Sequence, residues 1–376
     1  MPEQTPIKCV MMRGGTSKGV FFDERNLPKD AKQRERVILS LMGSPDPRQI
    51  DGLGGADPLT SKICIIGPGA EHGADVDYTF GQVGIEEPFV AFTTNCGNLS
   101  AAVGVYAIEE GYVAPQGPTT TVRIYNTNTR QILLAHVPVR AGQPAVAGDY
   151  VIPGVPGTGA EIRLDFSQTT GSTTGKLLPT GNRRDVLFVP KLGQSVEVSI
   201  VDVAKPTLFF RAEAVGITGT EGPDQFTQDI LDRFWAIREV AAEAIGLGKN
   251  SRMPTPVAVA PPASYINYMT KKEIPAGTMS FAARRVLGPP PRLHKAFAAT
   301  GAVCTAVAAQ MRGTVLNDVY VDRGGGIVLI GHPTGVFPVY AKLGPDDSVH
   351  EVSYSRTARR LMDGQAYVSC AVLETI

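Results

Sequence analysis

The alternation of apolar and polar residues predicts many short strands and few helices. Residues 226–245 carry apolar side chains at helical spacing on one face and charges on the other, which predicts an amphipathic helix. Residues 29–42 show a shorter pattern of this kind, ended by Gly43 and Pro45. β-Branched and aromatic runs predict strands at residues 63–66, 76–83, 89–92, 196–203 and 207–212, a strand–turn–strand unit at 10–22 and a hairpin at 119–139. We expect residues 140–185, rich in Gly, Pro, Thr and Ser, to form loops.

Two further helical segments consist of small residues. The first runs from Cys96 to about residue 110, and the same turn-into-helix sequence recurs at residues 299–307. When the two copies are aligned, Thr300 falls on Cys96 and Gly301 falls on Gly97. A strand with an aromatic doublet precedes each copy, at residues 21–22 and 209–210. The pattern therefore indicates an internal repeat in which one copy lacks the thiol.

The repeat predicts an α+β fold with two domains of similar topology, residues 1–185 and 186–376. In each domain we expect strands curved around a thin central helix, with the two helix N-termini facing each other across a cleft. Whether the last strand returns to the first domain stays open. A length of 376 residues agrees with two domains, because single cores rarely grow that large.

Composition and charge narrow the classes of partner. The chain has 36 basic and 36 acidic residues, and this zero net charge gives no support for nucleic-acid binding. It has no apolar run of about 18 residues and no signal-peptide pattern at its start, so we expect a cytoplasmic protein that binds no membrane. The five cysteines are scattered without a CxxC pair, which argues against a disulfide framework or a zinc site. A homo-oligomer stays open.

Cys96 is the first candidate for chemistry, because it lies where a polar turn becomes a helix. Unpaired N–H groups and the positive end of the helix dipole meet at such a point, and a thiol there can act as an acid, a base or a nucleophile. Most free cysteines are small buried hydrophobes, but Asn95, Gly97 and Asn98 make these surroundings polar. We therefore favour a functional role for Cys96 and a structural role for the other four cysteines.

Lys62 is the second candidate, since it precedes the apolar run 63–66. Partial desolvation at the mouth of a buried strand would make its amine a usable base. The side chain could equally extend from the strand end into solvent. Spacing alone does not decide between these two readings.

A turn at residues 13–18 is dense in hydrogen-bond donors: it holds the cations Arg13 and Lys18 and the hydroxyls of Thr16 and Ser17. That content suits a carboxylate or a phosphate, although P-loop spacing is absent and solvated hairpin turns look similar. The turn at 175–182 has the same ambiguity. Charges at 284–285 and 294–295 either reach the cleft or coat a surface, and we expect Arg284 and Lys295 on the surface.

Several motifs together resemble the PrpF-type isomerases, the family of 2-methylaconitate isomerase, 4-oxalomesaconate tautomerase and methylitaconate Δ-isomerase. The matching pieces are MRGGTSKG (12–19), GSPD (43–46), DGLGGA (51–56), TSK (60–62), DVDY (75–78), NCGN (95–98) and RTARRLM (356–362). Residues 52–62, 126–129 and 177–182 look most like the methylitaconate Δ-isomerase branch. The resemblance implies a diaminopimelate epimerase-like fold with two pseudo-symmetric domains.

The resemblance also implies that Lys62 and Cys96 are the catalytic pair. We expect no cofactor, because no cofactor motif is visible, and no metal, because Asp75 and Asp77 lack partners at metal-ligand spacing. Racemases of this fold use one thiol from each half, so Thr300 opposite Cys96 argues against a two-thiol racemase. The residues expected to bind a small carboxylate substrate are Arg13, Thr16, Ser17, Lys18, Ser61, Asn95, Gly97, Asn98, Thr300 and Gly301.

The predicted activity is a 1,3-proton shift that moves a C=C bond in a small unsaturated di- or tricarboxylate. Cis–trans isomerisation of aconitate or 2-methylaconitate is the first alternative, and tautomerisation of an oxo-acid is the next. An accessory protein that binds a tricarboxylate without converting it is the alternative from another class. The sequence leaves open the substrate and which of Lys62 and Cys96 removes the proton.

Overall fold

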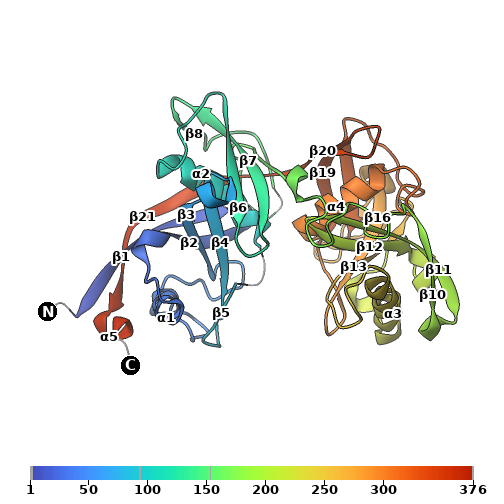
Figure 1. The fold of residues 1–376 in the computed structure, drawn as a ribbon, viewed down its shortest axis with the longest axis horizontal. Helices are drawn as coiled ribbons and strands as arrows, with labels where there is room; N and C mark the ends of the chain where they lie inside the picture. The colour runs from blue at the N-terminus through green and yellow to red at the C-terminus, as the bar shows by residue number, and fades with distance from the viewer. Residues whose placement is uncertain (1–2, 93–94, 153, 375–376) are drawn as a thin grey trace. The chain divides into compact units, whose positions relative to one another are not determined.

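The computed structural model describes residues 3–92, 95–152 and 154–374. The chain divides into two compact units, the first made of Met1–Asp165 and Ser355–Ile376 and the second of Phe166–Tyr354. The C-terminal strand β21 (Ala358–Ser369) belongs to the first unit, where it pairs antiparallel along the length of β1 (Gln4–Gly14). Figure 1 shows the strands of each unit around a helix, α2 in one and α4 in the other.

In the first unit the strands pair in the order β21-β1-β2-β3-β4-β6-β7-β9. All neighbours are antiparallel except the parallel pairs β2/β3 and β4/β6. The remaining strands are β2 (Ser17–Asp23), β3 (Lys62–Pro68), β4 (Val76–Val83), β5 (Val90–Ala91), β6 (Thr119–Asn126), β7 (Gln131–Arg140), β8 (Gln143–Pro144) and β9 (Ile162–Asp165). Two 3-10 turns, η1 (Glu24–Asn26) and η2 (Ala70–His72), and the short helix α5 (Cys370–Leu373) complete this unit.

Two helices cover opposite faces of these strands. Helix α1 (Ala31–Met42) packs its apolar face on the core that contains Val20, Phe22 and Ile63. Its N-cap is Asp30, and Gly43 ends it in a left-handed conformation with φ of 71°. Helix α2 (Gly97–Glu109) is almost wholly buried. A thin helix is required there, because a Cβ at Gly104 would lie 2.8 Å from Cβ of Ala135 on β7.

The second unit has strand order β10-β11-β12-β13-β16-β18-β19-β20, and its parallel pairs are β12/β13 and β16/β18. Its strands are β10 (Asp185–Val189), β11 (Gln194–Val203), β12 (Lys205–Arg211), β13 (Thr255–Ala260), β14 (Tyr265–Ile266), β15 (Glu273–Ile274), β16 (Phe281–Leu287), β17 (Arg292–Leu293), β18 (Ile327–His332), β19 (Gly335–Leu343) and β20 (Val349–Arg356). Its helices and 3-10 turns are α3 (Gln228–Ala244), α4 (Ala299–Gln310), η3 (Ser167–Thr169), η4 (Pro190–Leu192), η5 (Ala212–Val215), η6 (Pro223–Gln225) and η7 (Ala276–Thr278).

The helices expected from the sequence are confirmed as α1, α2, α3 and α4, and the fold is of the predicted α+β class. The expectation of loops throughout residues 140–185 is wrong in part, because β8, β9 and the start of β10 lie there. Strand β9 has four residues and pairs with β7. A strand this short is defined by its distant partner, which the local composition does not reveal.

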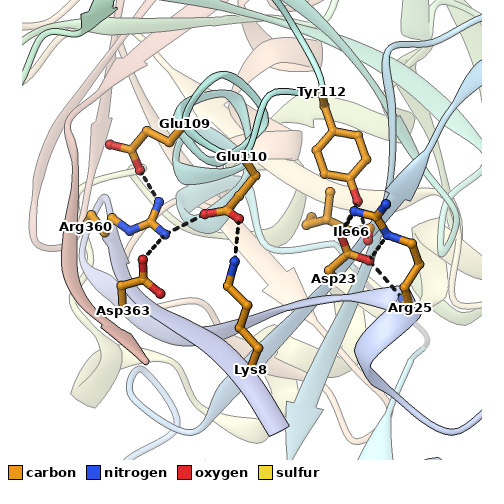
Figure 2. A network of polar contacts seen from close by, with 9 residues as sticks. All are labelled: Lys8, Asp23, Arg25, Ile66, Glu109, Glu110, Tyr112, Arg360 and Asp363. Carbon is orange, nitrogen blue, oxygen red and sulfur yellow. Dashed lines mark hydrogen bonds and ion pairs between the residues drawn. The ribbon is translucent and has the colours of Figure 1, made fainter. Parts of the chain in front are cut away.

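Salt bridges tie the C-terminal end of α2 to the strands beneath it (Figure 2). Arg360 on β21 donates to Glu109 at 2.9 Å and to Glu110 at 2.5 Å, and Lys8 on β1 lies 3.3 Å from Glu110. Burial by itself would raise the pKa of Glu110, but these hydrogen bonds outweigh it and lower the pKa. Carboxylates at a helix C-terminus oppose the helix dipole, so the two cations offset that cost.

A second group in Figure 2 joins β2 to the segment after α2. Tyr112 donates to Asp23 at 2.7 Å, and Arg25 donates to the same carboxylate through its main chain and its guanidinium. Burial opposes ionisation of Asp23, but these hydrogen bonds win and lower its pKa to about 2. The carboxylate therefore stays charged and holds both neighbours in place.

Replacement of Arg360 by Met should lower the free energy of unfolding at pH 7 by roughly 1–3 kcal/mol, because Glu109 and Glu110 lose their shared partner. The native pKa of Glu110 is lowered, so the loss should shrink as the pH falls through that pKa and Glu110 takes up a proton. Urea unfolding of wild type and R360M at pH 7 and pH 3.5 measures this.

The matched control is Lys191→Met, which removes an exposed ion pair with Glu239. Exposed pairs contribute at most about 1 kcal/mol, so K191M should change stability little. Equal stability of R360M and wild type at pH 7 would contradict the stabilising role of Arg360 toward Glu109 and Glu110.

Candidate active site

The turn between β1 and β2 covers the first turn of α2 in close contact. A Cβ at Gly14 would lie 2.6 Å from the Asn98 carbonyl oxygen and 2.9 Å from Cα of Leu99. Gly15 has φ of 52°, and a Cβ there would overlap the Asn98 side chain. Glycine is therefore required at both positions because a side chain would not fit, and at Gly15 also because its φ is positive. Because the turn can come this close, its donors surround the helix N-terminus.

Cys96 is the N-cap residue of α2, but its side chain makes no cap hydrogen bond. Its Sγ lies 3.9 Å from Oγ of Ser17, which is buried in the turn. Its carbonyl accepts hydrogen bonds from the main-chain N–H and the hydroxyl of Ser100 at 3.0 and 3.1 Å. The first helical hydrogen bond recorded among the described residues starts at Ser100, so the N–H groups of Gly97 and Asn98 have no intrahelical acceptor.

Lys62 is the first residue of β3 and is only 8% exposed. Its Nζ donates to Oε1 of Gln82 at 2.7 Å and lies 5.1 Å from the centre of the Phe80 ring. The Gln82 amide nitrogen donates in turn to the carbonyls of Ser61 at 2.9 Å and Pro58 at 3.2 Å. These two acceptors fix the amide so that its oxygen faces the lysine. The amine is therefore held in one place rather than extended into solvent.

The antiparallel register of β3 and β4 places Gln82 directly opposite Lys62. Gln82 was not among the site residues predicted from the sequence. The signal was available, because residues 76–83 were expected to form a strand and Gln82 is a polar residue near its end. What the sequence lacked was the register that pairs it with Lys62.

Hydrogen bonds of Asn98 and Asn95 hold the start of α2 in place. The Asn98 amide donates to Oγ1 of Thr16 at 3.0 Å, and its oxygen accepts from Nε of Arg356 at 2.9 Å. The Asn95 oxygen lies 3.3 Å from Oγ of Ser100 and 3.4 Å from the amide of Asn126 on β6. Arg356 lies in the RTARRLM motif but was not predicted as a site residue.

Ser61, predicted to bind substrate, is fully buried, and its hydroxyl donates to Oε1 of Gln49 at 2.6 Å. Gln49 also receives the main-chain N–H of Ala56 at 2.8 Å. The side chain of Ser61 thus holds the loop before β3, and its carbonyl helps to orient Gln82.

A cavity of about 600 Å³ opens beside the β1–β2 turn, within the first unit. Three of its lining residues are cations, namely Arg13, Lys18 and Arg359. Among the described residues that line it, none is a carboxylate. Thr16 and Ser17 supply hydroxyls, and Val146, Ile152, Val155 and Leu361 supply apolar surface. Lys62 and Cys96 do not line it, but Ser17 lines it and touches Cys96. The cavity therefore suits a small acid with an apolar portion.

Arg13 is fixed by two acceptors, since Nη1 donates to the carbonyls of Gly15 and Thr357, each at 2.9 Å. Burial, and then the nearby positive charge of Arg359, lower the pKa of Arg13. Two guanidinium groups that repel each other are stabilised by an anion bound between them.

Buried groups behind Cys96 remain protonated. Burial raises the pKa of the Cys64 thiol well above its usual range, and the nearby Cys96 adds to this, whereas Lys62 acts in the opposite direction. Burial also raises the pKa of Tyr78. Lys62 and Cys64 are two residues apart on β3 and therefore share one face of that strand.

Thr300 and Gly301 lie in the first turn of α4, in the second unit. The Gly301 N–H already donates to the carbonyl of Ala298 at 2.9 Å. The expectation that Arg284 lies on the surface is wrong, because this residue is fully buried. Its guanidinium lies 4.8 Å from the centre of the Tyr265 ring and Nε donates to the carbonyl of Glu221, so a long side chain on β16 finds its partners inside.

Among residues 3–92, 95–152 and 154–374, no group of three or more His, Cys, Asp or Glu side chains could hold a metal ion. Within the same residues, no helix is long and apolar enough to cross a membrane.

The sequence matches the PrpF protein family over residues 4–369. It is also 45% identical over 384 residues to 3-methylitaconate isomerase of Eubacterium barkeri, with 99% of this chain and 100% of that relative covered. The chain belongs to the PrpF family. The predicted isomerase class is confirmed by this relationship.

Solved structures support the assignment to the PrpF family. The crystal structure of a methylitaconate-delta-isomerase, 44% identical, superposes with a TM-score of 0.92 and covers 100% of this chain and 98% of its own. A hydroxyproline epimerase from Agrobacterium vitis, 12% identical, reaches a TM-score of 0.50 over 98% of this chain and 93% of its own. At that identity the second likeness shows only a shared α+β fold.

Thiol labelling tests how open the PrpF-family site is. Cys96 and Cys370 are partly exposed, whereas Cys9, Cys64 and Cys304 are buried. Brief treatment of the native protein with iodoacetamide should therefore alkylate Cys96 and Cys370 and leave the other three thiols intact, as read by peptide mass spectrometry. C370S serves as the control that should leave labelling at Cys96 unchanged. Modification of Cys64 before Cys96 would contradict the described site.

Proposed function

We propose that this PrpF-family isomerase moves a C=C bond by 1,3-proton transfer in a small unsaturated di- or tricarboxylate, with a methylitaconate-like acid as the first candidate. The observation that carries the proposal is a partly exposed thiol, Cys96, that touches Ser17 in the turn that also carries Arg13 and Lys18. The amine of Lys62, oriented by Gln82, is the proposed partner of this thiol. The similar protein from Eubacterium barkeri is named a 3-methylitaconate isomerase.

The carboxylates bind at the cations of the β1–β2 turn. Arg13 and Arg359 offer planar forks suited to a carboxylate, and Lys18 adds a third positive charge at the same cavity. The apolar lining accepts the carbon skeleton. Thr16, Asn95 and Asn98 act mainly by holding the helix start against the turn, and the Ser61 hydroxyl is engaged with Gln49.

Lys62 and Cys96 exchange the proton with the substrate. One of them removes a proton from the allylic carbon, the electron pair of that C–H bond forms the new C=C bond, and the old double bond accepts a proton from the other. No atom is gained or lost. The enzyme is left with one group protonated and the other deprotonated, and exchange with solvent restores both.

The charge that develops on the substrate carboxylate as the proton leaves needs stabilisation. The N–H groups of Gly97 and Asn98 and the positive end of α2 are aligned before the substrate binds, so they stabilise that charge without reorganisation. We also propose that Thr300, at the start of α4, stands at the position where a racemase of this fold has its second thiol.

We also propose that the fold is diaminopimelate epimerase-like, with two pseudo-symmetric domains. Support comes from the strand orders given above, which have parallel pairs at the same two positions. In both units a helix joins the first parallel pair and a small-residue helix follows the next strand: α1 and α2 in one, α3 and α4 in the other. Strand β21 takes the place at the sheet edge that β10 takes in the second unit.

Isomerisation in heavy water tests the proton transfer. With methylitaconate as substrate, wild type should incorporate deuterium at the carbon that gains the proton, observed by proton NMR as the new C=C bond forms. K62M and C96S should each lose at least about 100-fold in kcat, since general acid–base groups contribute on the order of 10²–10⁴. C370S is the matched thiol control and should retain full activity.

Three outcomes would contradict the mechanism. They are isomerisation by wild type without entry of deuterium into the product, full activity of K62M, and full activity of C96S. Running aconitate, 2-methylaconitate and oxalomesaconate in the same assay identifies the substrate. If the protein binds these acids tightly but converts none of them, the result would favour an accessory binding protein.

Gln82→Leu tests whether the amide orients Lys62. The lysine would lose its acceptor while the carboxylate site stays intact, so kcat should fall roughly 10- to 100-fold with KM changed less than about 3-fold. Gln194→Leu is the control, since Gln194 is an exposed glutamine whose amide donates to the carbonyl of Ala214 in the second unit. Unchanged kcat in Q82L, or a rise in KM alone, would refute the positioning role.

A further inference from the structure

We propose that Asn126 and Asn128, in the turn between β6 and β7, are positioning residues that hold the surroundings of both Lys62 and Cys96 for the proton transfer. Their role rests on the proposed function, which assigns the chemistry to that amine and that thiol. The evidence is separate, because it comes from side-chain hydrogen bonds that leave the turn and reach distant segments.

One edge of β4 has a gap between two partner strands, and the side chain of Asn128 fills it. Among the described residues, β6 pairs with this edge as far as Tyr78, and β5 pairs with it from Gln82 onward. Between them, the Phe80 N–H donates to Oδ1 of Asn128 at 2.8 Å, and Nδ2 of Asn128 donates to the Phe80 carbonyl at 2.9 Å. The amide thus takes the place of a strand residue and satisfies both main-chain groups.

Phe80 connects this turn to the lysine. The centre of its ring lies 5.1 Å from Nζ of Lys62, a distance at which a cation and an aromatic face attract each other. Phe80 also lies two residues before Gln82, whose amide oxygen accepts from the same amine at 2.7 Å. Residues two apart on a strand share one face. The position of the amine therefore depends on the part of β4 that Asn128 holds.

The same turn reaches the segment that leads to the thiol. Nδ2 of Asn128 donates to the Phe92 carbonyl at 2.7 Å, and Phe92 lies four residues before Cys96 in the sequence. Nδ2 of Asn126 lies 3.4 Å from Oδ1 of Asn95, the residue directly before Cys96. The turn therefore contacts the chain next to the thiol as well as the strand segment next to the amine.

Asn126 is fully buried and joins the two sets of contacts, because its Nδ2 lies 3.3 Å from Oδ1 of Asn128. Its Oδ1 accepts the main-chain N–H and the hydroxyl of Thr129 at 2.9 and 2.8 Å, which is ordinary bonding for an asparagine in a turn. The three bonds of Asn128 to main-chain groups have no such local role, because they join residues 36 to 48 positions apart. A hairpin turn does not need them.

Kinetics of Asn128→Ala and Asn128→Asp test the positioning role, with methylitaconate as the substrate. N128A removes all three bonds, whereas N128D keeps the oxygen that accepts the Phe80 N–H and loses only the donor to the two carbonyls. In both variants kcat should fall roughly 10- to 100-fold. KM should change less than about 3-fold, because the cations of the β1–β2 turn are untouched. N128D keeps the test valid if N128A does not fold.

Asn267→Ala is the matched control, because Asn267 is another buried asparagine in a hairpin turn. Its amide donates to the carbonyl of Thr334 at 2.9 Å, and its oxygen accepts the N–H groups of Met269 and Thr270 at 2.9 and 3.0 Å. N267A should lower the urea midpoint of unfolding as N128A does, but it should leave kcat unchanged. A second control is the K62M/N128D double variant. It should be no slower than K62M, since the amine to be positioned is absent.

Alkylation of Cys96 by iodoacetamide reports on the turn without any turnover. Its rate, relative to that of Cys370 in the same molecule, should rise at least about 3-fold in Asn126→Ala and in N128D, because the segment before the thiol loses its anchors. N267A should keep the wild-type ratio.

Wild-type kcat in N128A and N128D, with a wild-type alkylation ratio, would overturn the positioning role and leave the proposed function standing. A rise in KM alone, or multiplied losses in K62M/N128D, would also overturn the positioning role. Faster alkylation in N126A and N128D together with full activity of K62M and C96S would refute the proposed function alone. If wild type converts no methylitaconate, an unchanged alkylation ratio in both asparagine variants still overturns the positioning role.

Discussion

The close approach of the β1–β2 turn to the first turn of α2 is the constraint on which the rest of the first unit depends. Gly14 and Gly15 leave no room for side chains against Asn98 and Leu99. A helix of small residues then fits inside the strands, and Gly104 repeats the same requirement farther along. Because turn and helix touch, a thiol, free N–H groups and the cations of the turn all meet at one end of the helix.

Uncompensated positive charge marks both units at the start of their inner helix. In the first unit, Arg13 and Arg359 share a cavity without a carboxylate in its described lining. In the second, the guanidinium of Arg285 lies against the first turn of α4 and forms no ion pair among the described residues. Proteins rarely bury charge without a partner, and Arg285, 1% exposed with an unpaired Nε, is such a case. The opposite end of α2 differs, because there Arg360 and Lys8 neutralise Glu109 and Glu110 (Figure 2).

Orientation and exposure, more than residue type, separate Lys62 and Cys96, the proposed catalytic residues, from similar groups elsewhere. Lys62 differs from an ordinary strand-end lysine because Gln82 holds its amine, and Gln82 is itself held by two carbonyls. Cys96 differs from Cys64 in exposure, since the pKa of the buried Cys64 is raised well above the usual range. The chemistry of the site thus depends on neighbours that come from β4 and from the turn before β3.

The sequence by itself determined the helices, most strands, the internal repeat, the family and the residues at the N-terminus of α2, because these follow from local periodicity, small-residue composition and contiguous motifs. Only the tertiary structure decided what depends on register and burial. The pairing of β3 with β4 placed Gln82 beside Lys62, and the packing of β16 buried Arg284, which the charge pattern had suggested for the surface. Periodicity reports which face of an element is apolar, but the partner of a buried polar group comes from a distant segment and is fixed only when the chain folds.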